Sequence, residues 1–573
     1  MAEPGRAVVL APVLAIGLAA CAALPPPATA PPTPPPPASS LDLAFVDHHH
    51  LRQLEPDPER LARHVSAIRA NIDRGADLGI GSYVVFSRGF EDVQTYDFAI
   101  EPIGNVGAAA FPDPAARAAD AALYLGALRD VATHAHARGV RLIFHTNQLS
   151  FPDEVLAVLR PHMATAAAPC VDGPFLWSVY RAKLAAFWRA APFVDGLQLT
   201  ADEADMSVTE CVDADGRPVD PDAILGRLVA ETAGSAGTPG AGAPKEVQVR
   251  AWGRLADLAG GAAFAAAVDR LPPNVVVSIK HTEGDFVPLA PASHLLDHVG
   301  PRVVVEFDAW GEYAGWNAFP AYLGDVFAAR IRRLVAAGGR RVAVRINWNS
   351  SANPIFGVPY GNAVNVAVLA GLAKDPEADP DALLRAWIGE TYPAPSREAA
   401  FALYKASASL VARLFSPEGV DLTDHGRAFR GRQSRDQRER IAGMLAYVQS
   451  HGGLTTQEAF EARRRSIDQA RRDASARVAA LGDAAPAAWR TDLARGLQSL
   501  WRVARTTTDQ LELAYWHGER SAGRPVDSAA VSAAVRRIRD AVAEWSVEDP
   551  EAFDRLNGAE LLPTIAAFGF ETL

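Results

Sequence analysis

Short runs of apolar and β-branched residues recur along the first two thirds of the chain, and longer segments with a helical period separate them. Continuous apolar runs of this length are typical of strands in a parallel sheet that is covered on both faces. Eight such runs predict eight strands: one that ends at Val46, then 82–87, 140–146, 194–200, 246–252, 274–280, 303–309 and 341–347.

Two of the intervening segments show the helical pattern clearly, because proline near the start and glycine near the end mark helix boundaries. One helix is predicted to begin at Asp57–Pro58 and to end at Gly75, with an apolar stripe of Leu61, Val65, Ile68 and Ile72. Another is predicted from about Pro320 to Gly338–Gly339, with an inward face of Tyr322, Val326, Ile331 and Val335.

The alternation of strands and helices over residues 41–375 predicts a (β/α)8 TIM barrel. A doubly wound open sheet is the alternative, but no glycine-rich nucleotide-binding fingerprint follows an early strand. Strand signals end near residue 375, and helical periods follow, for example at 459–481 and 487–516. We therefore predict an α-helical C-terminal domain at 376–573. Its arginine run, 463–465, is predicted to lie on a solvated helix face.

The N-terminal residues are predicted to direct export rather than to fold. Arg6 precedes an apolar run that ends in 18-LAAC-21 and is too short to span a bilayer. This ending looks like a bacterial lipobox, so we predict a lipoprotein signal peptide at 1–20 and lipidation of Cys21. The alternative is an ordinary secretory signal with a chance cysteine. Residues 21–40 are rich in proline and predict an extended tether. The protein is expected to be exported and lipid-anchored to the cell envelope of a bacterium.

Composition narrows the class of protein. The chain has 573 residues, which predicts two globular units, and its 49% hydrophobic and 21% charged residues are normal for a soluble globular fold. The net charge is −11, and no basic stripe interleaved with aromatic residues is evident, which argues against a nucleic-acid partner. Cys170 and Cys211 are the cysteines other than Cys21, and an oxidising compartment favours a disulfide between them over two thiols.

The active site of such a barrel forms where the strands finish. The predicted strand ends carry carboxylates, amides, cations and aromatic rings, which together are the composition of a sugar site. We expect Glu203, Asp285 and Glu312 to be catalytic. We expect a second set to bind substrate: His145, Asn147, Arg250, Trp252, Lys280, Trp310, Arg345 and Asn347.

Cleavage of a glycosidic bond needs a protonated acid and a second carboxylate, which lie about 6.5–9.5 Å apart in inverting enzymes. Different strands provide that separation, so we pair Glu203 with Asp285 or Glu312. Leu197 and Leu199 precede Glu203, and apolar surroundings favour a protonated acid. The run 48-HHH-50 has no second set of ligands with metal spacing, so a solvated or supporting role is expected there. No metal and no cofactor is predicted.

The stretch 274–296, followed by 303–315, resembles the catalytic core of the α-glucuronidases of glycoside hydrolase family 67. The family pairs an Asp after one strand with a Glu after the next, and Asp285 and Glu312 match these at a spacing of 312 − 285 = 27 residues. The resemblance implies that Glu203, in 197-LQLTADEAD-205, is the general acid. It also implies that Arg250 and Lys280 hold a substrate carboxylate through charge-assisted hydrogen bonds. The segment 345–388 resembles the family's passage into a helical domain.

The implied activity is cofactor-free inverting hydrolysis that removes α-1,2-linked glucuronic acid, or its 4-O-methyl ether, from xylo-oligosaccharides. Asp285 and Glu312 would position and deprotonate the water. The chain departs from the family in lacking an N-terminal β-sandwich, in having Leu199 where the family has a lysine, and in placing Glu283 beside Asp285. The alternatives are hydrolysis of another uronic-acid-containing glycan, a non-catalytic glycan-binding surface lipoprotein, and a structural envelope protein.

Overall fold

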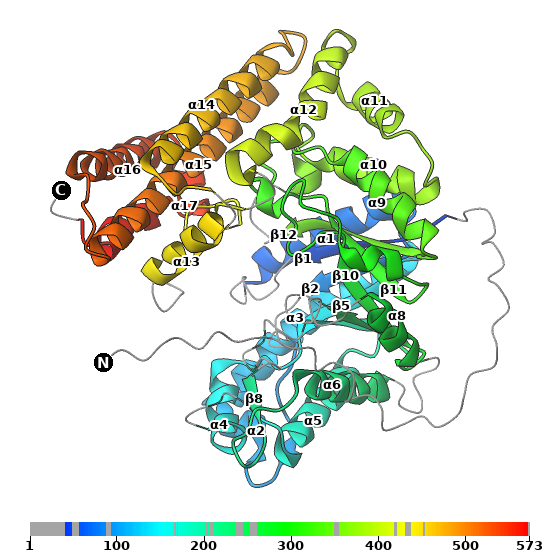
Figure 1. Ribbon diagram of the computed structural model, residues 1–573. Helices are drawn as coiled ribbons and strands as arrows, with labels where there is room; N and C mark the ends of the chain where they lie inside the picture. The colour runs from blue at the N-terminus through cyan, green and yellow to red at the C-terminus, as the bar shows by residue number, and fades with distance from the viewer. Residues whose placement is uncertain are drawn as a thin grey trace. The chain divides into compact units, whose positions relative to one another are not determined.

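The computed structural model of the 573-residue chain shows one closed barrel of parallel strands and a helical C-terminal region (Figure 1). The strand order around the barrel is β1-β12-β11-β10-β9-β7-β5-β2, and β1 pairs with β2 to close it. The predicted (β/α)8 barrel followed by helices is therefore confirmed. The residues that the structure describes are 40–48, 57–86, 93–165, 168, 170–200, 204, 206, 210–236, 244–251, 261–348, 354–417, 421–423, 425–429, 437–450 and 453–570.

All eight predicted strands are present within a residue or two of their expected ends. Their side chains are buried along almost the whole of each strand, because the barrel interior covers one face and helices cover the other. The strands are β1 (Asp42–His48), β2 (Ser82–Phe86), β5 (Arg141–Asn147), β7 (Gly196–Thr200), β9 (Glu246–Arg250), β10 (Val275–Lys280), β11 (Val303–Asp308) and β12 (Arg341–Trp348).

Helices and short elements connect these strands. The helices are α1 (Pro58–Leu78), α2 (Val106–Ala110), α3 (Pro114–Ala137), α4 (Asp153–Met163), α5 (Pro174–Ala190), α6 (Pro221–Ala236), α8 (Gly261–Arg270), α9 (Gly324–Ala336) and α10 (Ala363–Lys374). The short elements are β3 (Ala99–Ile100), β4 (Gly104–Asn105), β6 (Cys170–Val171), β8 (Cys211–Val212), η4 (His294–His298), η5 (Glu312–Ala314) and η6 (Ile355–Gly357).

The two helices predicted in detail are present, with corrected ends and faces. Asp57 caps α1 by accepting the backbone N–H groups of Glu59 and Arg60, as serine or aspartate does at a helix start. The helix ends at Gly79, whose φ of 93° suits glycine, and not at Gly75, which is buried inside it. In α9 the buried residues include Phe327, Ile331 and Leu334, whereas the predicted Val326 and Val335 are only half-buried.

The chain divides into two compact units. The first contains 88–126 and 145–277, and the second contains 38–87, 127–144 and 278–573. In the first unit, β6 pairs with β8, and a disulfide joins Cys170 to Cys211 with the Cα atoms 4.5 Å apart. The predicted boundary between residues 375 and 376 lies inside the second unit.

The C-terminal region is helical in all its described elements, and its long helices α14 and α15 lie side by side (Figure 1). Its elements are α11 (Pro380–Thr391), η7 (Ala394–Ser396), α12 (Arg397–Phe415), α13 (Gln437–Ser450), α14 (Gln457–Ala479), α15 (Ala487–Ser521), α16 (Ser528–Glu548), α17 (Pro550–Arg555), η9 (Gly558–Glu560) and α18 (Leu561–Ala567).

The prediction of a solvated arginine run at 463–465 is wrong for two of its three residues. Arg463 is 8% exposed and donates to the carbonyls of Arg413 and Leu414 at the end of α12. Arg464 is 7% exposed and donates to Asp509 and Glu512 on α15, at 3.1 and 2.7 Å. Arg537 on α16 reaches the same two carboxylates, at 2.8 and 2.6 Å.

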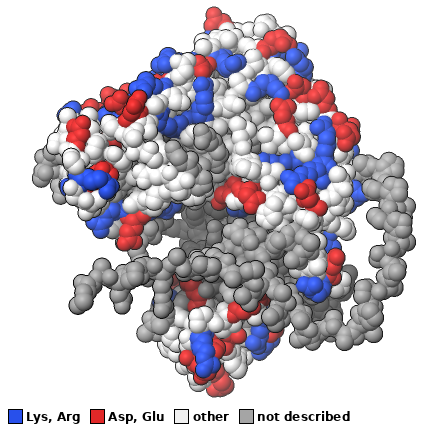
Figure 2. Space-filling view, viewed as in Figure 1, with Lys and Arg blue, Asp and Glu red and all other residues white. Residues whose placement is uncertain are grey.

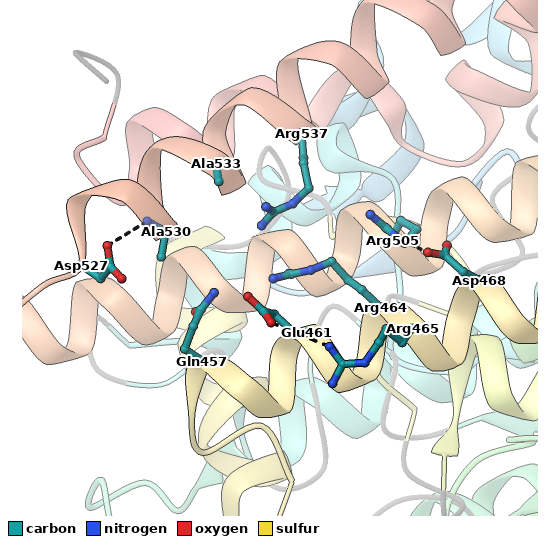
Figure 3. A pocket seen from close by; sticks show the side chains of 10 residues that line it. All are labelled: Gln457, Glu461, Arg464, Arg465, Asp468, Arg505, Asp527, Ala530, Ala533 and Arg537. Carbon is teal, nitrogen blue, oxygen red and sulfur yellow. Dashed lines mark hydrogen bonds and ion pairs between the residues drawn. The ribbon is translucent and has the colours of Figure 1, made fainter.

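A cavity of about 510 Å³ lies over this ion cluster. Figure 3 shows Arg464 and Arg537 extending toward each other from facing helices. The two arginines are thus neutralised by two carboxylates beneath the cavity, which is how buried charges are tolerated. We interpret the cluster as a tie between α14, α15 and α16.

Charges of both signs are mixed on the surface. Figure 2 shows basic and acidic side chains interspersed on the visible face of the helical region. Lys405, for example, donates to both Asp325 and Asp381, at 2.6 and 2.8 Å. No helix among the described residues is long and apolar enough to cross a membrane. Cys21 and the predicted tether lie outside the described residues, so their predicted roles stay predictions.

Candidate active site

The loops after β10 and β11 bring two of the predicted catalytic carboxylates into one cluster of charges. Lys280, at the end of β10, donates to one carboxylate oxygen of Asp285 at 2.5 Å. Tyr313 donates through its hydroxyl to the other oxygen at 2.5 Å. Arg345, on β12, donates to Glu312 and lies 3.5 Å from Glu306. We call Lys280, Asp285, Glu306, Asp308, Glu312, Tyr313 and Arg345 the carboxylate cluster.

The pKa values of the two candidate catalytic carboxylates move in opposite directions. Burial alone would raise the pKa of Asp285, but Lys280, Tyr313 and Arg345 together hold it well below its ordinary value. Burial raises the pKa of Glu312, although the positive charge of Arg345 opposes the rise. Pairs of groups whose surroundings separate their pKa values are a mark of acid–base sites.

The side chains of Asp285 and Glu312 also differ in solvent exposure. The side chain of Asp285 is 40% exposed, whereas that of Glu312 is 6% exposed. Lys280 is 11% exposed and Arg345 only 1%. A ligand therefore meets Asp285 first, and Glu312 lies deeper in the protein.

Asp308, the last residue of β11, holds the turn that carries Glu312. Its carboxylate accepts the backbone N–H groups of Trp310, Gly311 and Glu312, at 3.1, 3.1 and 2.9 Å. Burial raises the pKa of Asp308 to about 6. Because three consecutive N–H groups converge on one side chain, this turn has a fixed conformation, and Asp308 is a positioning residue for Glu312.

The two predicted cations contact carboxylates of the protein. Lys280 forms an ion pair with Asp285, and Arg345 forms one with Glu312. Both residues are expected to bind substrate, and Lys280 in particular a substrate carboxylate, and that role stays a prediction. The cluster contains four carboxylates against two cations. With every group ionised, the cluster would carry two more negative than positive charges.

Several other predicted residues lie outside this cluster. Trp310 is fully buried and packs on Trp316 with ring centroids 5.4 Å apart, so it supports the loop and offers no stacking face. Asn347 donates to Asp47 and accepts from the backbone of Ile355, both at 3.1 Å, which ties the ends of two strands.

The neighbouring histidines and Glu283 are also engaged elsewhere. Glu283, considered a competitor of Asp285, accepts from the backbone and ring of His294 at 3.0 Å. His48 is buried and stacks on Phe86, so of the two roles expected for the histidine run, solvated or supporting, this residue does not have the solvated one. No group of three or more His, Cys, Asp or Glu side chains among the described residues has an arrangement that could hold a metal ion.

The first compact unit contains another buried polar group of predicted residues. His145 lies 2.8 Å from the hydroxyl of Thr200, and Arg250 donates to the same hydroxyl at 3.3 Å. Asn147 is buried at the end of β5. Glu203 and Trp252 lie outside the described residues, so the position of the predicted general acid is not part of this geometry.

Tyr313, in the cluster, and His425, beside it, were not singled out from the sequence. Tyr313 follows Glu312 directly, and its hydroxyl completes the shell of Asp285. His425, from the helical region, lies close enough to Glu312 to lower its pKa. No local pattern marks His425, because it is distant in sequence from the strand ends.

The sequence matches no protein-family model. It is also not similar to any curated protein. Among solved structures, the chain is similar to a GH138 enzyme targeting pectin rhamnogalacturonan II, with a TM-score of 0.54 and 11% sequence identity. The likeness is one of fold. It covers 89% of this chain, which spans only 62% of the length of that enzyme.

Proposed function

We propose that this protein is a glycoside hydrolase whose acid–base centre includes Asp285 and Glu312. The observation that supports it best is the placement of these carboxylates, in the loops after neighbouring strands of a (β/α)8 barrel, with pKa values shifted in opposite directions. Paired carboxylates at strand ends are what glycosidic hydrolysis requires. The fold shared with a glycoside hydrolase agrees with this reaction class.

In the proposed reaction, Asp285 is the base that meets the attacking water. Lys280 and Tyr313 keep Asp285 ionised, and Asp285 is more exposed than Glu312. Glu312, fixed by Arg345 and by the turn that Asp308 holds, orients the water from the deeper side. Glu203 would protonate the leaving oxygen, as the resemblance to the α-glucuronidases implies, and the glycosidic bond would break with inversion.

The proposed substrate is a glycan that carries an α-linked glucuronic acid or its 4-O-methyl ether, such as a branched xylo-oligosaccharide. The sequence resemblance at 274–296 and 303–315 supports it. Pectin rhamnogalacturonan II, the target named for the structural neighbour, is the second substrate class to be tested.

We also propose that the protein acts at a bacterial cell envelope, held there by a lipid on Cys21. The apolar run, the LAAC ending and the proline-rich tether support this location. A substrate that reaches the envelope as a soluble oligosaccharide suits such a position.

The test is release of free sugar from α-1,2-glucuronosyl xylo-oligosaccharides and from a rhamnogalacturonan II digest by the full-length protein. Asp285→Asn and Glu312→Gln are expected to lower kcat/KM at least about 100-fold, the usual effect of losing acid–base catalysis. Glu203→Gln tests the proposed acid in the same assay.

Glu283→Gln is the matched control, because Glu283 pairs with His294 and not with the cluster. It should retain most activity. Equal activity of the Asp285→Asn variant and the parent would contradict the proposed site. A folded parent that hydrolyses neither substrate class would contradict the proposed function.

A further inference from the structure

A loop of the helical region lies against the turn that carries Glu312. We call the described residues 421–423 and 425–429 the 421–429 loop. Thr423 donates through its hydroxyl to Asp421 at 2.6 Å and accepts the backbone N–H of Gly426 at 2.8 Å, which closes the loop on itself. Most of the loop is buried, whereas Asp421 and His425 are partly exposed.

The loop is fixed to the barrel at three points. The indole N–H of Trp316 donates to the carbonyl of His425 at 2.8 Å. The guanidinium of Arg427 lies 4.2 Å from the centre of the Trp316 ring. The backbone at Gly426 comes so close that a Cβ there would lie 3.1 Å from the carbonyl oxygen of Glu312. These contacts make the loop part of the same rigid neighbourhood as Glu312.

The side chain of His425 is directed at the carboxylate cluster. Its ring meets that of Tyr313 edge to face, with centroids 4.9 Å apart and planes at 88°. The hydroxyl of Tyr313 in turn donates to Asp285. The backbone φ of His425 is 53°, a left-handed conformation that is uncommon outside glycine and that clusters at functional sites. His425 therefore lies beside Tyr313, the residue whose hydroxyl donates to the candidate base.

We propose that His425, contributed by the helical region, is a substrate-binding residue that donates a ring N–H to an oxygen of the sugar held at Asp285. This inference rests on the proposed glycosidase function and deepens it by naming a specificity-determining residue. The oxygen belongs to a hydroxyl or to the carboxylate of a uronic acid.

Charge supports this assignment. The cluster holds four carboxylates, and its two cations, Lys280 and Arg345, are paired within it. An anionic or hydroxylated sugar that approaches Asp285 needs hydrogen-bond donors, and a donor outside these ion pairs would add to those of Lys280 and Arg345. The imidazole of His425 is partly exposed, and its ring N–H can donate to such an oxygen.

The test compares full-length protein carrying His425→Asn with the parent, because asparagine tolerates the left-handed backbone and leaves the carbonyl bond to Trp316 in place. With glucuronosyl xylobiose, KM is expected to rise about tenfold or more, with a smaller change in kcat, as expected when a ground-state hydrogen bond is lost. The same comparison with the neutral glucosyl analogue separates the two sources of oxygen. A loss confined to the uronic substrate assigns the carboxylate, and an equal loss assigns a hydroxyl.

A second variant guards against a purely structural effect. If the ring of His425 binds substrate, added imidazole should restore part of the activity of His425→Ala. Added imidazole would not restore a variant that lost activity only because it misfolds. His298→Gln, a half-buried histidine on η4, is the matched control and should behave as the parent. Melting temperatures of all variants are measured beside the kinetics.

The outcomes separate the two proposals. If the parent hydrolyses the substrate and His425→Asn matches it in KM and kcat, this inference is overturned and the proposed function stands. If the parent binds the oligosaccharide without cleaving it and His425→Asn binds more weakly, hydrolysis is overturned and the role of His425 stands. If the folded parent neither binds nor cleaves any of these glycans, both are overturned.

Discussion

Asp308 is a single buried carboxylate that fixes the turn leading to Glu312. It accepts three backbone N–H groups from the turn before Glu312, and burial raises its pKa to about 6. Burial of this acid costs free energy, and the result is a turn with a fixed conformation. Strained or costly groups of this kind are commonly retained near functional sites.

Replacement of Asp308 by asparagine should change how stability depends on pH. The pKa of Asp308 is higher in the folded than in the unfolded state, so the protonated form of Asp308 stabilises the fold. This contribution to the free energy of unfolding is fully present below about pH 4 and is lost as pH rises through about 6. Asp308→Asn does not titrate. The free energy of unfolding of the parent relative to the variant should therefore fall by up to about 3 kcal/mol between pH 4 and pH 7.

Urea unfolding at several pH values measures this difference. Asp269→Asn, on the exposed side of α8, serves as the control and should show a constant offset. A constant offset for Asp308→Asn as well would contradict the raised pKa.

At the residue scale, the sequence could predict positions but not partners. Asp285, Glu312, Lys280 and Arg345 follow from the rule that barrel strands end at the site, and all four meet there. The pairing of Lys280 with Asp285 depends on three-dimensional distances, which no local sequence pattern gives. His425 could not be predicted, because its place beside Tyr313 is set by the packing of a distant loop.

At the scale of elements, α15 packs against the segment that follows Glu312. Gly496, in this helix, lies against the carbonyl of Ala318, and a Cβ at that position would overlap the oxygen. Four residues further along, Leu500 faces Gly315 so closely that a Cβ at Gly315 would come within 2.6 Å of it. The turn that starts at Asp308 therefore continues into a segment pressed on a helix from the C-terminal region.

Gly496→Ala should push α15 away from the 315–318 segment. Because the clash is with backbone, relief requires movement of the helix or the 315–318 segment, so stability should fall by about 1–3 kcal/mol, together with kcat/KM. Gly518→Ala, in the same helix, meets nothing within 4 Å and should raise stability by up to about 1 kcal/mol through helix propensity. Thermal unfolding and hydrolysis assays of both variants provide the measurement. An unaffected Gly496→Ala variant would refute the close approach.

Elements were more predictable than sites, for a physical reason. Apolar runs and helical periods are local, so the eight strands and the helical region follow from the sequence. Helix ends depend on contacts as well. Gly75 looks like a stop, but it lies inside α1 because only glycine fits beside Phe45 and Ile80. The burial of Arg463 and Arg464 likewise depends on acceptors contributed by other helices.

At the scale of the whole molecule, the barrel strands of the second unit and the helical region behave as one body. Trp316 bonds to the 421–429 loop, α15 packs on the segment after Glu312, and Lys405 on α12 pairs with Asp325 on α9. Because of these contacts, we do not expect the barrel strands of the second unit and the helical region to separate as independent parts. The sequence suggests two domains here, and the boundary near residue 375 stays a prediction.

Removal of residues 376–573 should therefore prevent folding rather than release an active barrel. The truncated chain would expose Trp316 and the segment at Gly315, and it would lose the carbonyl acceptor at His425. We expect no cooperative thermal transition for residues 1–375, against a cooperative one for the full chain. Calorimetry and near-ultraviolet circular dichroism test this. A truncated chain with native-like signals would show that the barrel folds alone.

The disulfide in the first unit has a consequence for where the chain can mature. It closes a loop with a sequence separation of 41 residues, which encloses α5 and β7. A crosslink of this span typically stabilises a fold by about 2–4 kcal/mol, a large share of the stability of most proteins. Chains synthesised in a reducing cytoplasm would lack it, since thiols persist there. Recombinant production through an oxidising secretory route should therefore yield more native protein than cytoplasmic expression.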